Sequence, residues 1–310
     1  MEFFKTTTSI AFMRTRRTWY GFSIAVILLS IGLLLFRGLN LGIDFTGGVV
    51  LQFEYPQAAN VEQTRTALAN TGHAGTVTTF GSANEVMVRL LPQENQDVNL
   101  VSREVTAVLQ GLVPGVQLRS SEVVGPQIGE ELTNQGGQAV SLTFILIAIY
   151  ILIRFQWKMS IGAVVAALHD PFIILGFFAL TQLTFDLSVL AALLAVVGFS
   201  LNDTVVVFDR VRENFLKMRR ASPEEVINVS VNETLSRTVI TSGATLAVVL
   251  VLLMIGGESL RSFSWALTVG IIVGTYSSIY VAGATALDMK LTAADLMPPQ
   301  EDKDEIDALP

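Results

Sequence analysis

The sequence predicts an α-helical polytopic membrane protein with six transmembrane helices and one external α+β domain between the first two helices. Three observations predict this fold class. Hydrophobic residues make up 51% of the chain and charged residues only 15%, against roughly 25% charged residues in soluble domains. Six segments approach the ~20 apolar residues that a spanning helix needs. The stretch 37–137, which separates the first two segments, has ordinary soluble composition.

The six predicted spans are long apolar runs at 19–36, 138–153, 161–180, 187–207, 237–255 and 263–287. The first follows basic residues, as the apolar region of a signal peptide does. However, the run is longer than that region, and it ends in Phe36-Arg37 without a small-residue cleavage pattern. We therefore predict an uncleaved anchor. The second run is short, and 132–138 is expected to extend it as a helix beyond the membrane face.

Lys and Arg residues near the span ends predict the orientation, because cytoplasmic links are enriched in them. They concentrate in the N-terminal segment and in the links after the second and fourth spans: Lys5, Arg14, Arg16, Arg17, Arg154, Lys158, Arg210, Arg212, Lys217, Arg219 and Arg220. The links 181–186 and 256–262 together contain a single basic residue, Arg261. We therefore predict a cytoplasmic N-terminus (1–18), a cytoplasmic loop (208–236) and a disordered acidic cytoplasmic tail (288–310).

The external segment 37–137 shows alternating strand patterns and helical spacing. Strands are predicted at 49–55, 76–80, 85–91 and 116–124, and helices at 61–70 and 98–109. The turn 81–84 is expected to join the second and third strands as a hairpin. The order β-α-β-β-α-β predicts a ferredoxin-like domain, on the periplasmic side. His73 lies between Gly72 and Gly75 and is interpreted as a turn residue rather than a ligand.

Ionisable residues within the spans are the strongest functional signal. Such a group costs roughly 2.5–3.5 kcal/mol on insertion scales, so it usually faces the bundle interior and marks a pathway. The predicted proton or ion pathway consists of Asp203, Arg237, Asp170, His169, Asn202 and Thr241. Two other interpretations stay open: Asp203 and Arg237 form a static ion pair, or Arg237 extends to the cytoplasmic surface.

Two further patterns concern packing rather than ions. Gly270, Gly274 and Ser278 recur every four residues, which permits close helix approach either within the bundle or at a moving subunit contact. Asp44 precedes Gly47 and Gly48 in a turn. Asp44 is expected to cap that turn, and the alternative is that it guides ions at the external face.

The sequence also excludes several classes of function. It contains no cysteine, so disulfides and thiolate metal sites are excluded. The net charge of −7 argues against nucleic-acid binding. A zinc-type helix motif, a phosphate loop and a nucleophile–base pair are not found in the sequence, so neither an enzyme, nor a metal, nor a cofactor is expected.

Three motifs carry a family resemblance: GIDFTGG at 42–48, GFSLNDTVVVFDRVREN at 198–214 and LSRTVITSG at 235–243. Together with six spans and a large first external loop, they resemble the SecF branch of the SecD/SecF family of protein-export membrane proteins, in the resistance–nodulation–division superfamily. The resemblance implies a ferredoxin-like external domain. It also implies that Asp203 and Arg237 take part in proton flow.

The resemblance further implies partners and an energy source. Family members pair with SecD, associate with the SecYEG channel and accessory membrane subunits, and act on unfolded preprotein in the periplasm. They use the proton-motive force, or sodium in some bacteria, across the inner membrane. Two other functions remain: a half-size transporter of small molecules from the same superfamily, and a structural scaffold of the translocon without ion coupling.

Overall fold

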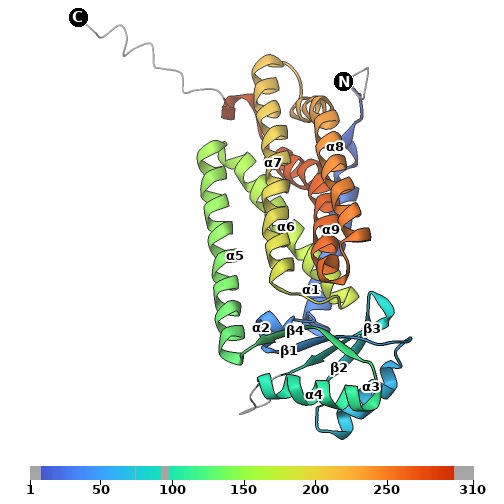
Figure 1. Cartoon of the computed structure of the whole chain (residues 1–310). Coiled ribbons are helices and arrows are strands. Elements are labelled where there is room, and N and C mark those ends of the chain that lie inside the picture. Colours follow the sequence, from blue (N-terminus) through green and yellow to red (C-terminus); the bar gives the residue numbers. More distant parts are fainter. Residues whose placement is uncertain (1–7, 74, 92–97, 297–310) are drawn as a thin grey trace, which may run out of the picture.

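Six long helices lie side by side, and a four-stranded sheet with two helices packs against one end of them (Figure 1). The computed structural model describes residues 8–73, 75–91 and 98–296. The long helices of this described part are α1 Arg16–Phe36, α5 Pro126–Arg154, α6 Trp157–Thr181, α7 Leu187–Lys217, α8 Pro223–Ile255 and α9 Arg261–Ser277. Each is long and apolar enough to span a membrane, α9 together with its flanking turns. The predicted fold class is confirmed.

The sixth span is not a uniform helix. The short turn η2 Glu258–Leu260 precedes α9, and a π-helical turn, η3 Ser278–Gly283, joins α9 to α10 Ala284–Asp288. A π turn adds one residue to a helical turn and occurs often at functional sites. Here it lies against α6, because a Cβ added at Gly162 would be 2.6 Å from the carbonyl oxygen of Ala282. Only glycine allows this approach.

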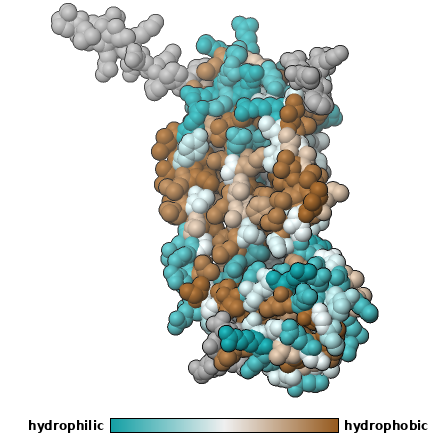
Figure 2. All heavy atoms as spheres, in the orientation of Figure 1, coloured by the Kyte–Doolittle hydropathy of each residue, from teal (hydrophilic) through white to brown (hydrophobic). Residues whose placement is uncertain are grey.

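The bundle has an inner and an outer set of helices. In the most apolar 18-residue stretch of each helix, the buried share of residues is 56% in α6, 44% in α7 and 61% in the sixth span. The corresponding share is 11% in α1, 11% in α5 and 17% in α8. Figure 2 shows a hydrophobic belt over the helices and hydrophilic surface at both ends. This distribution is that of a lipid-exposed surface. The outer helices therefore supply most of the apolar exterior and the inner helices supply the core.

The external domain is a ferredoxin-like unit. Its elements are β1 Gly48–Glu54, α3 Val61–Asn70, β2 Thr76–Phe80, β3 Ser82–Leu90, α4 Val98–Leu112 and β4 Gln117–Val124. The strands pair antiparallel in the order β2-β3-β1-β4. Alternate residues of β1, namely Val49, Leu51 and Phe53, are buried in one core with residues of α3 and α4. The period-2 pattern thus produces a sheet covered on one face, as predicted.

Two element boundaries differ from the prediction. Ser82 pairs with Phe80, so the hairpin turns at Gly81 alone (φ +74°), and residues 82–84 belong to β3 rather than to a loop. The helix of the second span begins at Pro126, before the predicted helical extension from 132. Proline is favoured in the first helical turn, where its missing N–H is not needed. The external domain therefore ends with β4, and α5 leads directly into the membrane.

The predicted cytoplasmic loop 208–236 is largely helical. Helix α7 continues to Lys217, and α8 begins at Pro223 after Ser222, whose Oγ accepts a bond from the Glu225 amide at 3.2 Å. The two extensions pack together because they carry apolar residues such as Phe215 and Ile227, both buried. A loop was expected because the segment links two apolar runs and is rich in Lys and Arg. The charges lie on the outer faces of a helical hairpin.

The start of the tail is also ordered, contrary to the prediction of disorder from 288. Leu291 is fully buried, and Lys158 Nζ lies 2.7 Å from Asp295 Oδ2 in the turn η4 Ala293–Leu296. The rest of the predicted acidic tail, 297–310, lies outside the described residues. Residues 288–296 therefore pack against the helices at this end of the bundle.

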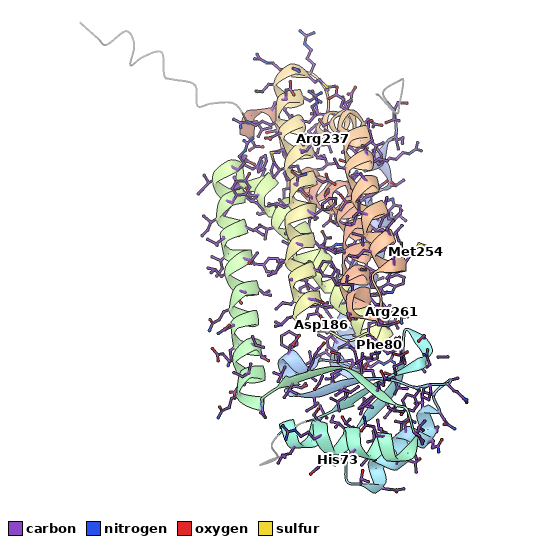
Figure 3. All side chains as sticks on the ribbon, in the orientation of Figure 1. His73, Phe80, Asp186, Arg237, Met254 and Arg261 are labelled. Carbon is purple, nitrogen blue, oxygen red and sulfur yellow. The ribbon has the colours of Figure 1, made fainter. Side chains whose placement is uncertain are left out.

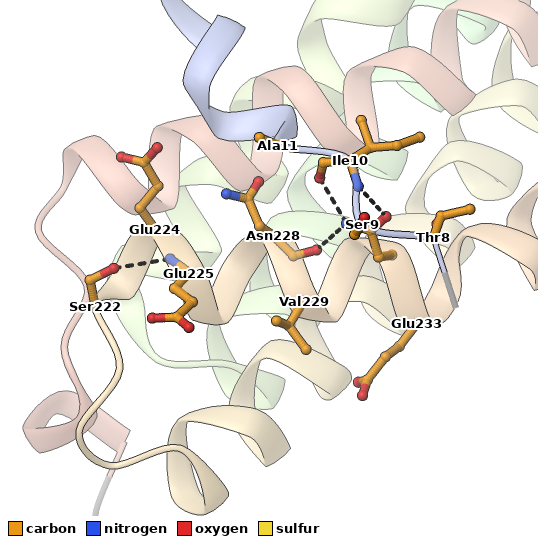
Figure 4. Close-up of a pocket in the computed structure, with 11 residues that line it drawn as sticks. Thr8, Ser9, Ile10, Ala11, Ser222, Glu224, Glu225, Asn228, Val229 and Glu233 are labelled. Carbon is orange, nitrogen blue, oxygen red and sulfur yellow. Dashed lines mark hydrogen bonds between the residues drawn. The ribbon is translucent and has the colours of Figure 1, made fainter. Parts of the chain in front are cut away.

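Residues 8–13 form an arm that lies along the beginning of α8 (Figure 4). The Ile10 amide donates to Asn232 Oδ1 at 3.0 Å, and Asn232 Nδ2 donates to the Ile10 carbonyl at 2.8 Å. One turn earlier, Asn228 Oδ1 accepts from the Met13 amide at 2.9 Å. The arm borders a pocket of about 460 Å³ that Glu224, Glu225 and Glu233 also line. Two asparagines therefore hold the arm by its backbone.

Candidate functional site

Asp203 lies where α7, α8 and the sixth span meet, and it is only 3% exposed. Ser242 Oγ on α8 donates to Asp203 Oδ2 at 3.4 Å, and Ser242 in turn accepts from Thr275 Oγ1 on α9 at 2.9 Å. The first contact is long, since O–H···O bonds are usually about 2.7–2.8 Å. Asp203 is therefore a buried carboxylate that is held loosely, which suits a group that gains and loses a proton.

Arg237 does not neutralise Asp203 directly. Among the ion pairs within 4.0 Å in the described part of the chain, none joins these two residues. Arg237 lies on the exposed side of α8, toward the end opposite the sheet domain (Figure 3). Thr238 and Ser242 form the buried side of the same helix. The static ion pair considered from the sequence is not present, and Arg237 faces out of this chain.

The predicted pathway residues Asn202 and Thr241 are not buried in the bundle interior. Asn202, next to Asp203, is exposed on the outer face of α7. Thr241 is partly exposed and its hydroxyl donates to its own helix, to the Arg237 carbonyl at 2.9 Å. The one-turn spacing of Arg237 and Thr241 does place them on one face, as predicted. That face is turned toward the surroundings of the chain.

Asp170 is a second buried carboxylate, and unlike Asp203 it is held tightly. It is fully buried and receives three hydrogen bonds. Ser200 Oγ and Ser277 Oγ donate to its Oδ2 at 2.5 and 3.0 Å, and His169 Nδ1 lies 2.9 Å from its Oδ1. Three donors compensate a carboxylate for its lost hydration. The structure thus places Asp170 and His169 together, as the sequence predicted, at the contact of α6, α7 and α9.

The other side of His169 faces α1. His169 Nε2 lies 3.2 Å from Ser23 Oγ, and Ser23 Oγ lies 2.5 Å from the Tyr276 hydroxyl. Tyr276 OH also donates to the backbone carbonyl of Trp19 at 3.0 Å. A continuous row of polar atoms therefore crosses from α6 through α1 to α9.

The turn at Asp44–Gly48 connects the membrane helices to the sheet. Asp44, in the short helix α2 Ile43–Thr46, does not cap its own turn: its Oδ2 accepts a bond from the Leu187 amide at 3.0 Å, at the first residue of α7. Gly47 (φ +66°) and Gly48 (φ +127°) adopt conformations that favour glycine. A Cβ on Gly47 would be 3.0 Å from Pro126 Cα, and one on Gly48 would clash with the Leu90 carbonyl. The turn thus fixes β1 and β3, α5 and α7 together.

A cleft of about 490 Å³ separates the uncovered face of the sheet from the adjoining ends of the helices. Phe80, Asp186 and Arg261 line it, and Figure 3 shows where they lie. Arg89 of β3 crosses the cleft and donates to Asn40 Oδ1 at 3.2 Å and to the Leu41 carbonyl. Burial lowers the pKa of the Arg89 guanidinium from its ordinary value. Arg89 therefore ties the sheet to the segment that precedes Asp44.

The small residues of α9 pack within the chain. A Cβ on Gly270 would clash with Val196 of α7, and one on Gly274 would be 2.9 Å from Ser200 Cβ. Ser278 accepts from Thr204 Oγ1 at 3.1 Å. These contacts bring the helices close enough for Ser200 and Ser277 to reach Asp170. Of the two interpretations, the geometry corresponds to bundle packing.

Comparison with known proteins identifies the family. The family model "Protein export membrane protein SecD/SecF, C-terminal" matches residues 104–292, and the SecD/SecF GG motif matches residues 32–59. The chain is 46% identical over 313 residues to protein translocase subunit SecF of Vibrio alginolyticus, covering 100% of this chain and 99% of the relative. The chain belongs to the SecD/SecF family. It is also 43% identical over 305 residues to the SecF subunit of Pseudomonas aeruginosa, covering 97% and 98% of the two chains.

Solved structures of the SecD/SecF family share the fold. The chain matches crystal structures of SecDF from Thermus thermophilus and of SecDF in a super-membrane-facing form, with TM-scores of 0.83 and 0.71. Each match has 36% identity and covers 93% of this chain but only 39% of the SecDF chain. The chain thus spans less than half of these structures.

The GG-motif match of the SecD/SecF family includes the Asp44–Gly48 turn, so the motif's glycines are those at the junction described above. Sequence reasoning missed Ser23, Ser200, Ser277 and Tyr276, which complete the polar row around His169 and Asp170. Serine and tyrosine are common in spanning helices, so no single-position signal marks them. Within the described residues, no three His, Cys, Asp or Glu side chains converge as metal ligands, and the absence of a cofactor stays a prediction.

Proposed function

We propose that this chain is an accessory subunit of the Sec preprotein translocase. With a SecD partner, it uses the proton-motive force to drive late translocation and release of preproteins at the SecYEG channel. The role is mechanical and ion-coupled rather than enzymatic. The names of its relatives and its family membership support the translocase assignment. The proton coupling is supported by one observation above all, the loosely held and buried carboxylate of Asp203.

The location follows from the same proposal. Both ends of the described chain lie opposite the sheet domain, as the contact of Arg16 with Asp288 at 3.2 Å illustrates. The Lys- and Arg-rich links are at that end as well, which supports a cytoplasmic placement. The chain is a multi-pass membrane protein. In the proposed orientation it lies in the bacterial inner membrane with the ferredoxin-like domain in the periplasm.

The proposed cycle begins with a proton on Asp203. A protonated carboxyl group no longer attracts cations, and it becomes a donor rather than only an acceptor. Its contact with Ser242 and the packing of α7 against α8 then change between two states. Asp170 is unsuited to this first step because three donors stabilise its charged form.

Helix α7 provides the route from Asp203 to the external domain. Asp203 lies 16 residues after Leu187, which is roughly 24 Å along the helix at ~1.5 Å per residue. The Leu187 amide is held by Asp44, and β1 begins at Gly48, four residues after Asp44. A shift of α7 therefore acts on the sheet through one hydrogen-bonded turn.

One face of α7 is suited to the partner subunit. Small residues follow one another along the exposed side of this otherwise buried helix: Ala191, Ala195, Gly198 and then Asn202. Small residues allow a second helix to approach closely, and exposed polar groups in a span need a protein partner. Arg237 is exposed on the neighbouring α8. We place the SecD contact on this face, where Arg237 and Asn202 meet the partner.

The test is a pulse-chase of a secreted precursor in cells whose only copy carries Asp203→Asn. We expect precursor to accumulate although the protein is present in the membrane and is recovered with SecD. Asp209→Asn is a matched control: it removes one carboxylate from the same helix, at the surface pair with Arg154. Normal export in the Asp203→Asn cells would refute proton coupling through Asp203 and would favour the scaffold.

A further inference from the structure

We propose that Ser23 and Tyr276 form a hydrogen-bonded proton wire that leads from one side of the bundle to the buried His169–Asp170 pair. The proposal rests on the proton coupling proposed above, and it adds a second route, distinct from Asp203. It assigns a function to two residues from opposite ends of the sequence.

The wire has four members in hydrogen-bonding distance. Tyr276 OH lies 2.5 Å from Ser23 Oγ, Ser23 Oγ lies 3.2 Å from His169 Nε2, and His169 Nδ1 lies 2.9 Å from Asp170 Oδ1. Exposure falls along the row: Tyr276 is partly exposed, Ser23 is 4% exposed, His169 3% and Asp170 fully buried. Tyr276 is therefore the member of the row nearest the surface, and the Asp170 carboxylate is the most deeply buried.

The number of hydrogens allows two bonding patterns. Each hydroxyl has one hydrogen to donate, and Tyr276 has two acceptors within reach, Ser23 Oγ and the Trp19 carbonyl. In the first pattern Tyr276 donates to Ser23, Ser23 donates to His169 Nε2, and the imidazole is neutral. In the second pattern His169 Nε2–H donates to Ser23, Ser23 donates to Tyr276, and Tyr276 donates to Trp19. The imidazole then carries a positive charge.

The two patterns are the states before and after one proton passes. A proton from a hydronium ion binds the Tyr276 oxygen and leaves neutral water behind, while the original Tyr276 proton moves to Ser23. The Ser23 proton moves to His169 Nε2 at the same time. Each hydroxyl ends with one hydrogen, as it began, and only His169 gains a charge. The Trp19 carbonyl completes the wire because it accepts the Tyr276 hydrogen in the second pattern.

The surroundings of Tyr276 are mostly aromatic. The Trp19, Phe22 and Tyr280 rings pack around Tyr276, with centroids 5.3, 6.2 and 5.6 Å from its ring. Aromatic residues of this kind are typical of the membrane interface. Two turns further along the same pair of helices, Ser30 of α1 packs directly against Gly176 of α6. The Cβ and Cα of Ser30 also lie against this glycine, so the contact persists without the Ser30 hydroxyl.

The test is the exchange of the His169 ring hydrogens with D₂O, followed by solid-state NMR of the full chain in lipid bilayers with ¹⁵N-labelled histidine. The sequence contains only two histidines, so His73 of the sheet domain serves as an internal reference. Tyr276→Phe and Ser23→Ala are expected to slow the exchange at His169 by about two orders of magnitude, the usual effect of removing a positioned proton carrier. Tyr280→Phe and Ser30→Ala remove hydroxyls from the same surroundings and are expected to leave the exchange rate unchanged.

Exchange at the wild-type rate in both Tyr276→Phe and Ser23→Ala would overturn the wire, as would equal slowing in all four variants. An unchanged His73 signal shows that the sheet domain of a variant is folded, and the two control variants report general effects of substitutions in the bundle. The measurement does not depend on export, so it separates the two proposals. Slowed exchange with normal export in Asp203→Asn cells would retain the wire and refute the coupling, and the reverse result would refute the wire alone.

Discussion

The carboxylate of Asp44 accepts a hydrogen bond from the backbone amide of Leu187 at 3.0 Å, so the segment that leads into the sheet also caps the helix that carries Asp203. Asp186, the adjacent residue, caps the same helix from its own side through the Val189 amide at 3.0 Å. Two carboxylates at a helix N-terminus satisfy free N–H groups and interact favourably with the helix dipole. The external domain and the fourth span are therefore joined at one charged point.

Replacing Asp44 should uncouple the domain from the helix. We expect Asp44→Ala to lower the free energy of unfolding by about 1 kcal/mol, as for other lost N-caps, and to slow export. Asp186→Ala is the control, because it removes a cap of the same helix but no link to the sheet. Thermal unfolding of the purified chain and a pulse-chase report the two effects. Equal export defects in both variants would contradict the special role of Asp44.

Two of the glycines with positive φ, Gly48 at the start of β1 and Gly38 just after α1, should differ in their tolerance of a side chain. Gly48→Ala meets the Leu90 carbonyl and a left-handed conformation together, so we expect the variant to fail to accumulate in membranes. Gly38 also has a positive φ, of +68°, but a Cβ there would meet no atom within 4 Å. Gly38→Ala should cost only the ~1–2 kcal/mol of the backbone conformation. Similar membrane levels for both would show that the β1–β3 contact is not needed.

Substitutions at Gly270 of α9, which packs against α7, and at Gly198, on the exposed face of α7, should distinguish an effect on folding from an effect on assembly. Gly270→Ala pushes α9 away from Val196 and should lower the free energy of unfolding by about 1–3 kcal/mol, as overpacking does. Gly198 lies on the exposed face of α7, and a Cβ there would meet no atom of this chain within 4 Å. Gly198→Leu should leave the stability of the isolated chain unchanged and reduce its recovery with SecD. Unreduced recovery would contradict the proposed partner face.

A buried hydroxyl on α8 offers a test of what surrounds Asp203. Thr238 is 3% exposed, and its Oγ1 has no hydrogen-bond partner among the described residues. Thr238→Val keeps the shape and removes the unpaired group, so the chain should become more stable by about 1 kcal/mol. Ser242→Ala, one turn later, removes the hydroxyl that contacts Asp203 and should reduce export instead. A loss of export in Thr238→Val would contradict this division of roles.

The packed start of the tail should depend on pH through Asp295. Partial burial acts to raise the pKa of this carboxyl, but hydrogen bonds from Lys158 and Thr292 outweigh it and hold the pKa below its ordinary value. The folded pKa is lower than the unfolded one, so the stabilisation is present above the unfolded pKa. It is lost as the pH falls through the folded pKa. Amide hydrogen exchange of 288–296, corrected for the intrinsic effect of pH, should therefore stay slow at neutral pH and rise only in strong acid. Asp295→Asn should already show faster exchange at neutral pH.

The predictable parts of the fold are those that depend on sequence patterns within one short segment. The alternation along 49–55 predicted β1, and the apolar runs predicted the spans. The cost of burying charge singled out Asp203 and Asp170. The relations between distant residues were not predictable. Tyr276 and Ser23 are 253 positions apart, and Asp44 and Leu187 are 143 apart, so their contacts depend on how whole helices pack.

The orientation of Arg237 could not be predicted for a different reason. Helix α8 is apolar on nearly all sides within the membrane, so no hydrophobic face tells which side points inward. The sequence indicated only that Asp203 and Arg237 lie in a hairpin of neighbouring spans, and an ion pair between them was one of several interpretations. Ser242 and Thr238 take the inward side because they are small and allow α7 and α9 to approach.

The two asparagines that hold the N-terminal arm set an order of events during synthesis. Ile10 is bonded by Asn232, which follows it by 222 positions. At a translation rate of roughly 5–20 residues per second, the arm leaves the ribosome about 10–45 seconds before its partner does. During this interval four spans must enter the membrane while the arm has no α8 to bind. Closing the arm onto α8 therefore follows the synthesis of the first four spans.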